Sequence, residues 1–278
     1  MSRYLRTAYE AGLATALLMG AFLWSSEAAA QDSRERFSLT AGALSVNADA
    51  EFSSVRPGRP DLGVRLDDLG ADDADKSFIG SVLWNMGDRW VLRLDTFGFN
   101  SSGANIAERD FTYDDTTVTV GMRVEGGLDI DIYMVNLGYR FIDNEQWEMG
   151  AGLGVHYIRL DFAFEATLSA NGDNVVVVGE EETKEEFPVP NLYAWTEYRF
   201  NDSLALAVNG GWLSATYGDY DGELYFLRAA LEFDFSDRFG VGAGYWVSDF
   251  DVERSKSSTT ERYHVDLPGP YVYLTMRL

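Results

Sequence analysis

Apolar and polar residues alternate along most of the chain, and the clearest stretch runs from Glu223 to Val247. In its first half one face carries Leu227, Ala229, Leu231, Phe233 and Phe235, with Arg228, Ala230, Glu232 and Asp234 between them. Because successive side chains of a strand point to opposite faces, this period indicates two strands joined by a turn at Ser236–Arg238. The apolar face would point inward in a soluble sandwich and toward lipid in a transmembrane barrel.

The same alternation, interrupted by turn residues, predicts about ten strands. They cover roughly Phe37–Asn47, Ser77–Met86, Arg89–Asn100, Leu128–Ile142, Trp147–Phe164, Asn191–Phe200, Leu204–Thr216, the two halves of Glu223–Val247, and Tyr271–Leu278. In the fourth strand the apolar row changes face near Met134, where a β-bulge would re-aim the strand. In the fifth it changes face again before Arg159.

The connections between these strands alternate in length. Short turns lie at Gly87, Asp143–Glu145, Asn201–Ser203 and Ser236–Arg238. Long polar connections lie at Ala48–Lys76, Ser101–Gly127, Glu165–Pro188 and Glu253–Asp266, and Gly218–Gly222 is the short exception. This asymmetry is typical of transmembrane barrels with short periplasmic turns and longer extracellular loops.

Aromatic residues gather near the short turns. We predict that they form a periplasmic girdle of Trp84, Trp90, Tyr139, Phe141, Trp147, Tyr198, Phe200, Phe233, Phe235 and Phe239. Such girdles lie at membrane interfaces, whereas a soluble sandwich has no reason to collect aromatics at one end of every strand. The predicted fold is therefore all-β, a single antiparallel up-and-down transmembrane β-barrel of about ten strands.

The first thirty residues have the layout of a cleaved signal peptide. Arg3 and Arg6 precede an apolar run from Ala11 to Trp24, and small residues favour cleavage after Ala30. We therefore expect a signal peptide over residues 1–30 and a barrel domain over residues 31–278. The chain has no cysteine, which excludes disulfides, and its net charge of -23 argues against a nucleic-acid partner.

The exported N-terminus, the even meander with unequal loops and the last strand, YVYLTMRL, resemble Gram-negative outer-membrane β-barrel proteins. The resemblance covers the whole mature chain. It implies a place in the outer membrane, contact with the lipid bilayer and lipopolysaccharide, and recognition of the last strand by the barrel assembly machinery. Members of this class usually end in Phe, whereas this chain ends in Leu278.

Charged residues of both signs fall on the face predicted to line the lumen. They are Arg93, Asp95, Asp129, Asp131, Arg140, Glu148, His156, Arg159, Asp161, Glu197, Arg199, Arg228, Glu232, Asp234 and Arg277. Charges in a narrow lumen should pair, and barrels of about eight strands are filled by side chains whereas wide pores use about 16. We therefore expect an ion-paired, largely filled lumen and a structural or surface-interaction role, with a narrow porin-like channel as the alternative.

Two rows of alternate glycines, at residues 150–154 and 240–244, predict room in the lumen for large neighbours such as Trp195 or Trp246. Acidic runs in the first and third long loops would bind cations only weakly.

A second alternative is an outer-membrane hydrolase, because the omptin proteases also have ten strands and use paired aspartates with an Asp–His pair. Here the comparable pairs are Asp129 with Asp131, Asp249 with Asp251, and His264 with Asp266, in an order that does not reproduce the omptin motif. We assign no catalytic residue, cofactor or metal.

Overall fold

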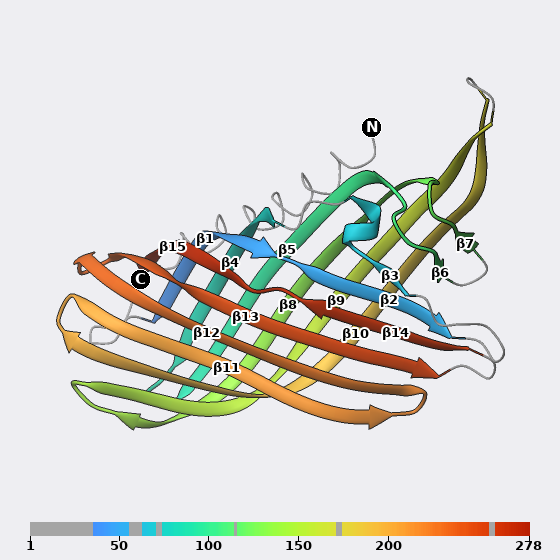
Figure 1. Ribbon diagram of the computed structural model, residues 1–278. Coiled ribbons are helices and arrows are strands. Elements are labelled where there is room, and N and C mark those ends of the chain that lie inside the picture. Colours follow the sequence, from blue (N-terminus) through green and yellow to red (C-terminus); the bar gives the residue numbers. More distant parts are fainter. Residues whose placement is uncertain (1–35, 56–62, 71–73, 114–115, 171–173, 256–258) are drawn as a thin grey trace, which may run out of the picture. The chain divides into compact units, whose positions relative to one another are not determined.

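The computed structural model describes residues 36–55, 63–70, 74–113, 116–170, 174–255 and 259–278 (Figure 1). The predicted signal peptide lies outside these residues. The chain divides into two compact units, Met1–Glu35 and Arg36–Leu278, and the second is described below. Across the described residues, no helix has the length and apolar character needed to cross a membrane.

Strands make up nearly all of the described structure, together with one short 3-10 helix, η2 (Asp67–Leu69). The strands are β1 (Phe37–Asn47), β2 (Asp49–Val55), β3 (Val64–Arg65), β4 (Ala74–Met86), β5 (Trp90–Ile106), β6 (Phe111–Tyr113), β7 (Thr116–Val118), β8 (Arg123–Asp143), β9 (Trp147–Ala170), β10 (Asn174–Asn201), β11 (Leu204–Tyr217), β12 (Tyr220–Ser236), β13 (Phe239–Ser255), β14 (Thr260–Asp266) and β15 (Gly269–Arg277).

Ten of these strands close into an antiparallel ring, which confirms the predicted barrel. Their order is β1-β4-β5-β8-β9-β10-β11-β12-β13-β15, and pairing of β1 with β15, as at Leu44↔Tyr271, closes it. Short turns join strands at one end, which we call the turn end; we call the other the loop end. Toward the loop end β2 and β14 continue β1 and β15 and pair with each other.

Several strands run further toward the loop end than the alternation pattern predicted. β10 begins at Asn174 instead of Asn191, and the expected loop Glu165–Pro188 is largely a hairpin of β9 and β10. Its acidic run pairs across that hairpin, with Glu180 opposite Glu165. The run had indicated a loop because charges alternate there with small or polar residues instead of apolar ones.

The expected bulge near Met134 is wrong. On β8, every second residue from Leu128 to Arg140 is buried and the residues between are half-buried or exposed, and pairing with β9 shifts only between Arg140 and Ile142. What changes near Met134 is the chemistry of the two faces. Toward the loop end the inward row is apolar and the outward row is charged, and toward the turn end the two are reversed.

The outward-facing side chains therefore mark where the strands pass from lipid into water. Exposed apolar residues form a belt that we call the apolar band: Leu94, Val135, Leu137, Leu153, Val155, Leu192, Leu227, Leu231, Val241, Val247, Val272 and Leu274. On β9, Leu153 is 65% exposed, whereas six and eight residues further on the exposed side chains are those of Arg159 and Asp161. An apolar outer face suits lipid and a charged one suits water, so the strand leaves the membrane between these residues.

Beyond the apolar band, in what we call the loop-end zone, the barrel becomes two facing walls (Figure 1). One wall contains β5, β8, β9 and β10, and the other contains β11, β12, β13, β14 and β2. Aromatic rings meet between them: Phe52 stacks on Phe162 at 4.5 Å between centroids, and Phe187 lies 5.9 Å from Phe250. This arrangement is that of a soluble sandwich, with an apolar core and a polar exterior.

Short elements from two loops cover the open end of this core. Leu66 and Leu69, at η2, are buried, and so are Phe111 on β6 and Val118 on β7. Phe111 packs edge-on against Phe164 of β9, with centroids 5.9 Å apart. The apolar core is thereby closed at the loop end as well as along its walls.

The predicted girdle residues lie beside the short turns. Trp90 packs against Tyr139 at 5.4 Å, and Trp147 packs against Tyr198 at 4.6 Å. Most of the set is exposed on the outer face, namely Trp90, Tyr139, Phe141, Trp147, Phe200, Phe233, Phe235 and Phe239, whereas Trp84 and Tyr198 are half-buried. Indole and phenol rings in these positions suit the level of lipid head groups.

Candidate functional site

An ion pair crosses the lumen inside the apolar band. Arg228 on β12 contacts Asp95 on β5, with Nη1 and Oδ1 3.1 Å apart. The two strands are five places apart in either direction around the ring of ten, so the pair joins opposite walls. The side chains are only 7% and 2% exposed. The pair therefore occupies the axis of the barrel.

Neighbouring polar groups complete this ion pair. Arg93 donates from Nε to both carboxylate oxygens of Asp95, at 3.0 and 3.1 Å. Arg228 donates from Nε to Oδ1 of Asn209 at 2.9 Å, and its guanidinium lies 4.7 Å from the ring of Trp246. We call Arg93, Asp95, Asn209 and Arg228 the crossbar. Buried charges are tolerated when paired and hydrogen-bonded, as all three charges are here.

A second charged group lies closer to the turn end. Arg277 on β15 pairs with Glu232 and with Asp234 on β12, the latter at 2.5 Å. The hydroxyl of Tyr273 donates to Oε2 of Glu232 at 2.9 Å. Asp234 is 31% exposed, whereas Asp95 and Arg228 are 2% and 7% exposed, so Asp234 is more accessible to water than the ion pair between Asp95 and Arg228.

A third group fills the opposite side of the lumen. Arg140 pairs with Glu148 at 3.1 Å and donates from Nη2 to Oδ1 of Asn85 at 2.7 Å. Trp195 donates from Nε1 to Glu148 at 3.0 Å. Near the turn end, Arg199 pairs with Glu197 at 2.9 Å. His156 also lies inside the lumen and is 2% exposed. Its ring packs on Phe226, and among the described residues it takes part in no ion pair.

The glycine rows make room for large side chains, as expected. The ring of Trp195 occupies the space that a Cβ at Gly138 or Gly150 would need. In the second row, Tyr273 takes that space beside Gly242, where Trp246 had been suggested. Any larger residue at these glycines would displace an aromatic ring from the lumen.

Four residues of the predicted lumen network lie on the outer face instead, namely Asp129, Asp131, Arg159 and Asp161. Arg159 pairs with Glu186 at 3.3 Å and Asp161 with Lys184 at 3.3 Å, all about half exposed. Their inward placement was wrong because it assumed that polar residues face the lumen along the whole strand. Beyond the apolar band the outside is water, so polar residues face outward.

The sequence prediction also missed the uncharged polar residues of the lumen. They are Asn85, Asn136, Asn191, Asn209, Tyr193, Tyr271 and Tyr273, which contribute hydrogen bonds or burial to the groups above. The sequence did contain a signal for them, because most of them lie an even number of residues from a charged lumen residue on the same strand and therefore share its face. The lumen residues were predicted from charge alone.

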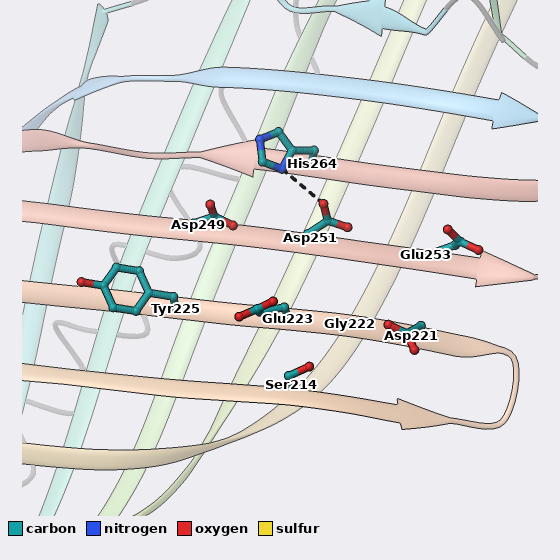
Figure 2. A pocket seen from close by; sticks show the side chains of 9 residues that line it. All are labelled: Ser214, Asp221, Gly222, Glu223, Tyr225, Asp249, Asp251, Glu253 and His264. Carbon is teal, nitrogen blue, oxygen red and sulfur yellow. Dashed lines mark ion pairs between the residues drawn. The ribbon is translucent and has the colours of Figure 1, made fainter.

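The outer face of the loop-end zone carries a groove of about 530 Å³ (Figure 2). It is lined by Ser214, Asp221, Gly222, Glu223, Tyr225, Asp249, Asp251, Glu253 and His264. Nδ1 of His264 lies 3.5 Å from Asp251, and Nε2 lies 3.5 Å from Asp266. Burial raises the pKa of Asp249, which lies beyond the spanning part of β13, and the charge of Asp266 raises it further.

The chemistry of this groove is acidic rather than catalytic. No group of three or more His, Asp or Glu side chains suited to a metal ion occurs in the described part of the chain. Ser214 and His264 are separated by three strand spacings, through Glu223 and Asp251, or about 14 Å. A serine at that distance cannot exchange a proton with the histidine.

The aspartate pairs considered for a protease do not converge. Asp129 and Asp131 lie on β8, and Asp249 and Asp251 lie on β13, which is five places away around the ring. Both pairs alternate with buried residues and so face outward. The structure thus brings His264 next to Asp251 and Asp266, but leaves the first pair on the opposite wall.

An antiparallel ring with an outer apolar band, aromatic residues beside short turns and charged pairs in the lumen defines an outer-membrane-type β-barrel. No protein-family model and no curated protein sequence matches the chain. The fold is similar to that of the outer-membrane protease OmpT from Escherichia coli, with a TM-score of 0.60 and 10% identity over 90% of this chain and 99% of that chain. At that identity the similarity shows the fold alone.

Other solved structures match more loosely. The translocator domain of the autotransporter NalP from Neisseria meningitidis has a TM-score of 0.45 and 11% identity, over 98% of this chain and 97% of that chain. The toluene transporter TodX from Pseudomonas putida has a TM-score of 0.36 and 7% identity, over 90% and 91%.

Proposed function

We propose that the protein is an outer-membrane barrel that is closed along its axis and serves as a surface scaffold, with the loop-end zone projecting outside the cell. The observation that carries this proposal is the apolar core of that zone. It contains Phe52, Phe97, Phe99, Leu128, Ile130, Ile132, Ile158, Leu160, Phe162, Phe164, Leu224, Phe250, Val252, Tyr263 and Val265. Among the described residues, a core packed in this way supports a lumen that is closed on the loop-end side of the crossbar.

The outward residues of the loop-end zone support a role at the surface. They are predominantly acidic, in keeping with the net charge of -23, and they include the groove around His264. The separated aspartate pairs favour a non-enzymatic role over a hydrolase. Contact with lipopolysaccharide at the apolar band and recognition of β15 by the assembly machinery complete the proposal.

Single-channel recording in planar bilayers tests the closed axis. We expect no discrete conductance steps from the folded protein, and none from Arg228→Ala, because the core still closes the lumen when the crossbar is removed. A wide porin of about 16 strands, reconstituted in the same way, is the positive control. Discrete steps that change with Arg228→Ala would refute a closed axis and favour a narrow channel.

Location is tested separately by fractionation. The protein should be recovered with the outer membrane, and the detergent-extracted form should migrate faster before heating than after it. Recovery in the soluble periplasmic fraction, without this heat-modifiable migration, would contradict the proposed location.

A further inference from the structure

The wall of the barrel parts between β10 and β11, just beyond the apolar band (Figure 1). Backbone pairing between the two strands ends at Leu192↔Trp212. β10 nevertheless stays paired with β9 as far as Asn174, and β11 stays paired with β12 as far as Tyr217. No strand in the described part of the chain pairs with the edge of β10 that faces away from β9 beyond Leu192. We call this gap the seam.

Two prolines explain why the seam begins there. Pro188 and Pro190 have no backbone N–H, and residues two apart on a strand direct their backbone groups to the same neighbour. Pairing of β10 with β9 continues through Pro188↔Tyr157 and Pro190↔Val155 without a shift in register. The missing donors therefore face β11, and the ladder cannot extend past Leu192.

Side-chain contacts join the two sides of the seam. Arg254 on β13 pairs with Glu185 on β10 at 2.8 Å, and its guanidinium lies 5.2 Å from the ring of Tyr220. Phe187 meets the same tyrosine ring edge-on at 6.2 Å. Val189 and Tyr220, one on each side, are only partly buried although both pack against the apolar core. The core therefore reaches the surface at the seam.

The corresponding gap on the other side of the barrel is covered in part. β5 leaves β4 beyond Phe97, but η2 packs over that edge, where Asn105 donates to the carbonyl of Asp67 at 3.5 Å. Arg109 also donates to the carbonyl of Gly63 at 2.9 Å. In the described residues η2 thus lies over the edge of β5 around Asn105, eight residues beyond Phe97 toward the loop end.

The seam begins at the border of the apolar band, next to the lipid. Leu192 and Trp212, the last paired residues, are 52% and 47% exposed, and Leu192 belongs to the apolar band. Trp212 donates from Nε1 to Glu223 at 2.9 Å, as an indole at a membrane–water interface would. Acyl chains of the outer leaflet therefore border the lower end of the seam.

We propose that the seam binds one acyl chain of an outer-leaflet lipid, which enters sideways between Val189 and Tyr220 and lies against Phe187 and Phe250. An acyl chain binds to apolar side chains, and here such side chains are partly exposed next to the lipid. This inference goes beyond the proposed scaffold role. It does not need an open axis, because the crossbar lies closer to the turn end than the seam does.

Photo-crosslinking in proteoliposomes tests the proposal. The probe is a phosphatidylcholine with a diazirine at the end of one acyl chain, and labelled residues are located by mass spectrometry. Leu153, which faces lipid on the outer wall, is the internal standard. We expect label on Phe187, Tyr220 or Phe250 in the wild-type protein. Label on Leu153 with none on these three residues would overturn the proposal.

Variants then test the route. The double variant Pro188→Val with Pro190→Val restores two backbone N–H donors, so β10 can pair further with β11. The ratio of label on the interior residues to label on Leu153 should then fall about tenfold, the change expected of two added backbone hydrogen bonds. Pro270→Val, which replaces an outward proline on β15 away from the seam, is the matched control and should leave the ratio unchanged.

A second variant leaves the prolines in place. Val189→Trp fills the seam from β10 with a side chain instead of a ladder, and it should lower the same ratio. Heat-modifiable migration identifies which variants fold. Interior label that stays at the wild-type ratio in a folded variant of either kind would overturn the route through the seam.

Discussion

Removing Asp95 should destabilise the barrel more than removing Arg228, although the two form one ion pair. Asp95→Ala leaves the guanidinium groups of Arg93 and Arg228 without their shared carboxylate, and that of Arg228 is only 7% exposed. Breaking a buried pair by removing one partner costs about 3–5 kcal/mol, because the other charge stays buried and uncompensated. We expect a loss in that range for Asp95→Ala.

Arg228→Met has a smaller expected cost. Asp95 keeps Arg93, which donates to both of its oxygens at 3.0 and 3.1 Å, so no charge is left alone. What is lost is the pair of hydrogen bonds from Arg228 to Asp95 and Asn209, about 1–3 kcal/mol in total. Methionine retains most of the packing against Trp246.

Urea unfolding of the protein in lipid vesicles, followed by tryptophan fluorescence, measures both free energies. The double variant should lose less than the sum of the two single losses, because it leaves Arg93 alone, and Arg93 is 21% exposed and can reach water. Glu145→Ala, on an exposed turn, is the control and should stay within about 0.5 kcal/mol of wild type. Equal losses for the two single variants, or a larger loss for Arg228→Met, would refute this account of the crossbar.

Three further predictions concern the two zones of the barrel. Leu160→Asp places an unpaired charge in the loop-end core and should cost about 3 kcal/mol or more, whereas Asp161→Leu, next to it on the outer face, should change stability by less than about 1 kcal/mol; the reverse order in urea unfolding would contradict the placement of these strands. Gly150→Val should displace the indole beside it and cost about 1–3 kcal/mol, while Ala151→Val, which faces lipid, should not, and equal unfolding midpoints would exclude the packing role of the glycine row. Asp249→Asn should stabilise the protein at pH 7 and have little effect near pH 4: a carboxyl whose folded pKa is raised above 3.8 contributes stability below that value and loses it as the pH rises through the folded pKa. Thermal unfolding at both pH values measures this, and an equal gain at pH 4 would show that the charge of Asp249 is not the cause.

Sequence patterning predicted the barrel, its strand number and its short turns because those features depend on local alternation. On β12, Leu231 and Phe233 face outward and Arg228 and Glu232 face inward, as their spacing indicated. Pairing across the lumen was not predictable in the same way. Asp95 and Arg228 are 133 residues apart, and nothing local indicates that opposite walls meet at that level.

The reversal of polarity on β8 and β9 was visible in the sequence but was interpreted as a change of strand geometry. A one-residue slip and a change of outer solvent produce the same pattern, since each moves the apolar residues to the other row. The two differ in what they require of the neighbouring strand. A bulge is local to one strand, whereas a change of solvent reverses every strand at one level.

That criterion could have been applied to the sequence. The reversal occurs near Met134 on β8 and near His156 on β9, which are paired with each other in the ladder. It recurs on β13, where Val247 faces lipid and Asp249 and Asp251 face water, while Phe250 joins the core. Reversals at matching heights on several strands indicate a membrane border.

The border also explains how one chain can be both a barrel and a sandwich. In lipid every backbone group needs a partner within the protein, so the ring must close through each strand. Beyond Leu192, water can satisfy an open edge, and Pro188 and Pro190 are tolerated only there. The seam therefore begins where the solvent changes because that is the first height at which the wall can part without a cost in unpaired backbone groups. If the seam arose from the prolines alone, moving them would move it, and a proline at Ala194, inside the apolar band, would create a longer seam in a folded protein. We expect instead that Ala194→Pro abolishes heat-modifiable folding, whereas Pro188→Ala leaves it intact.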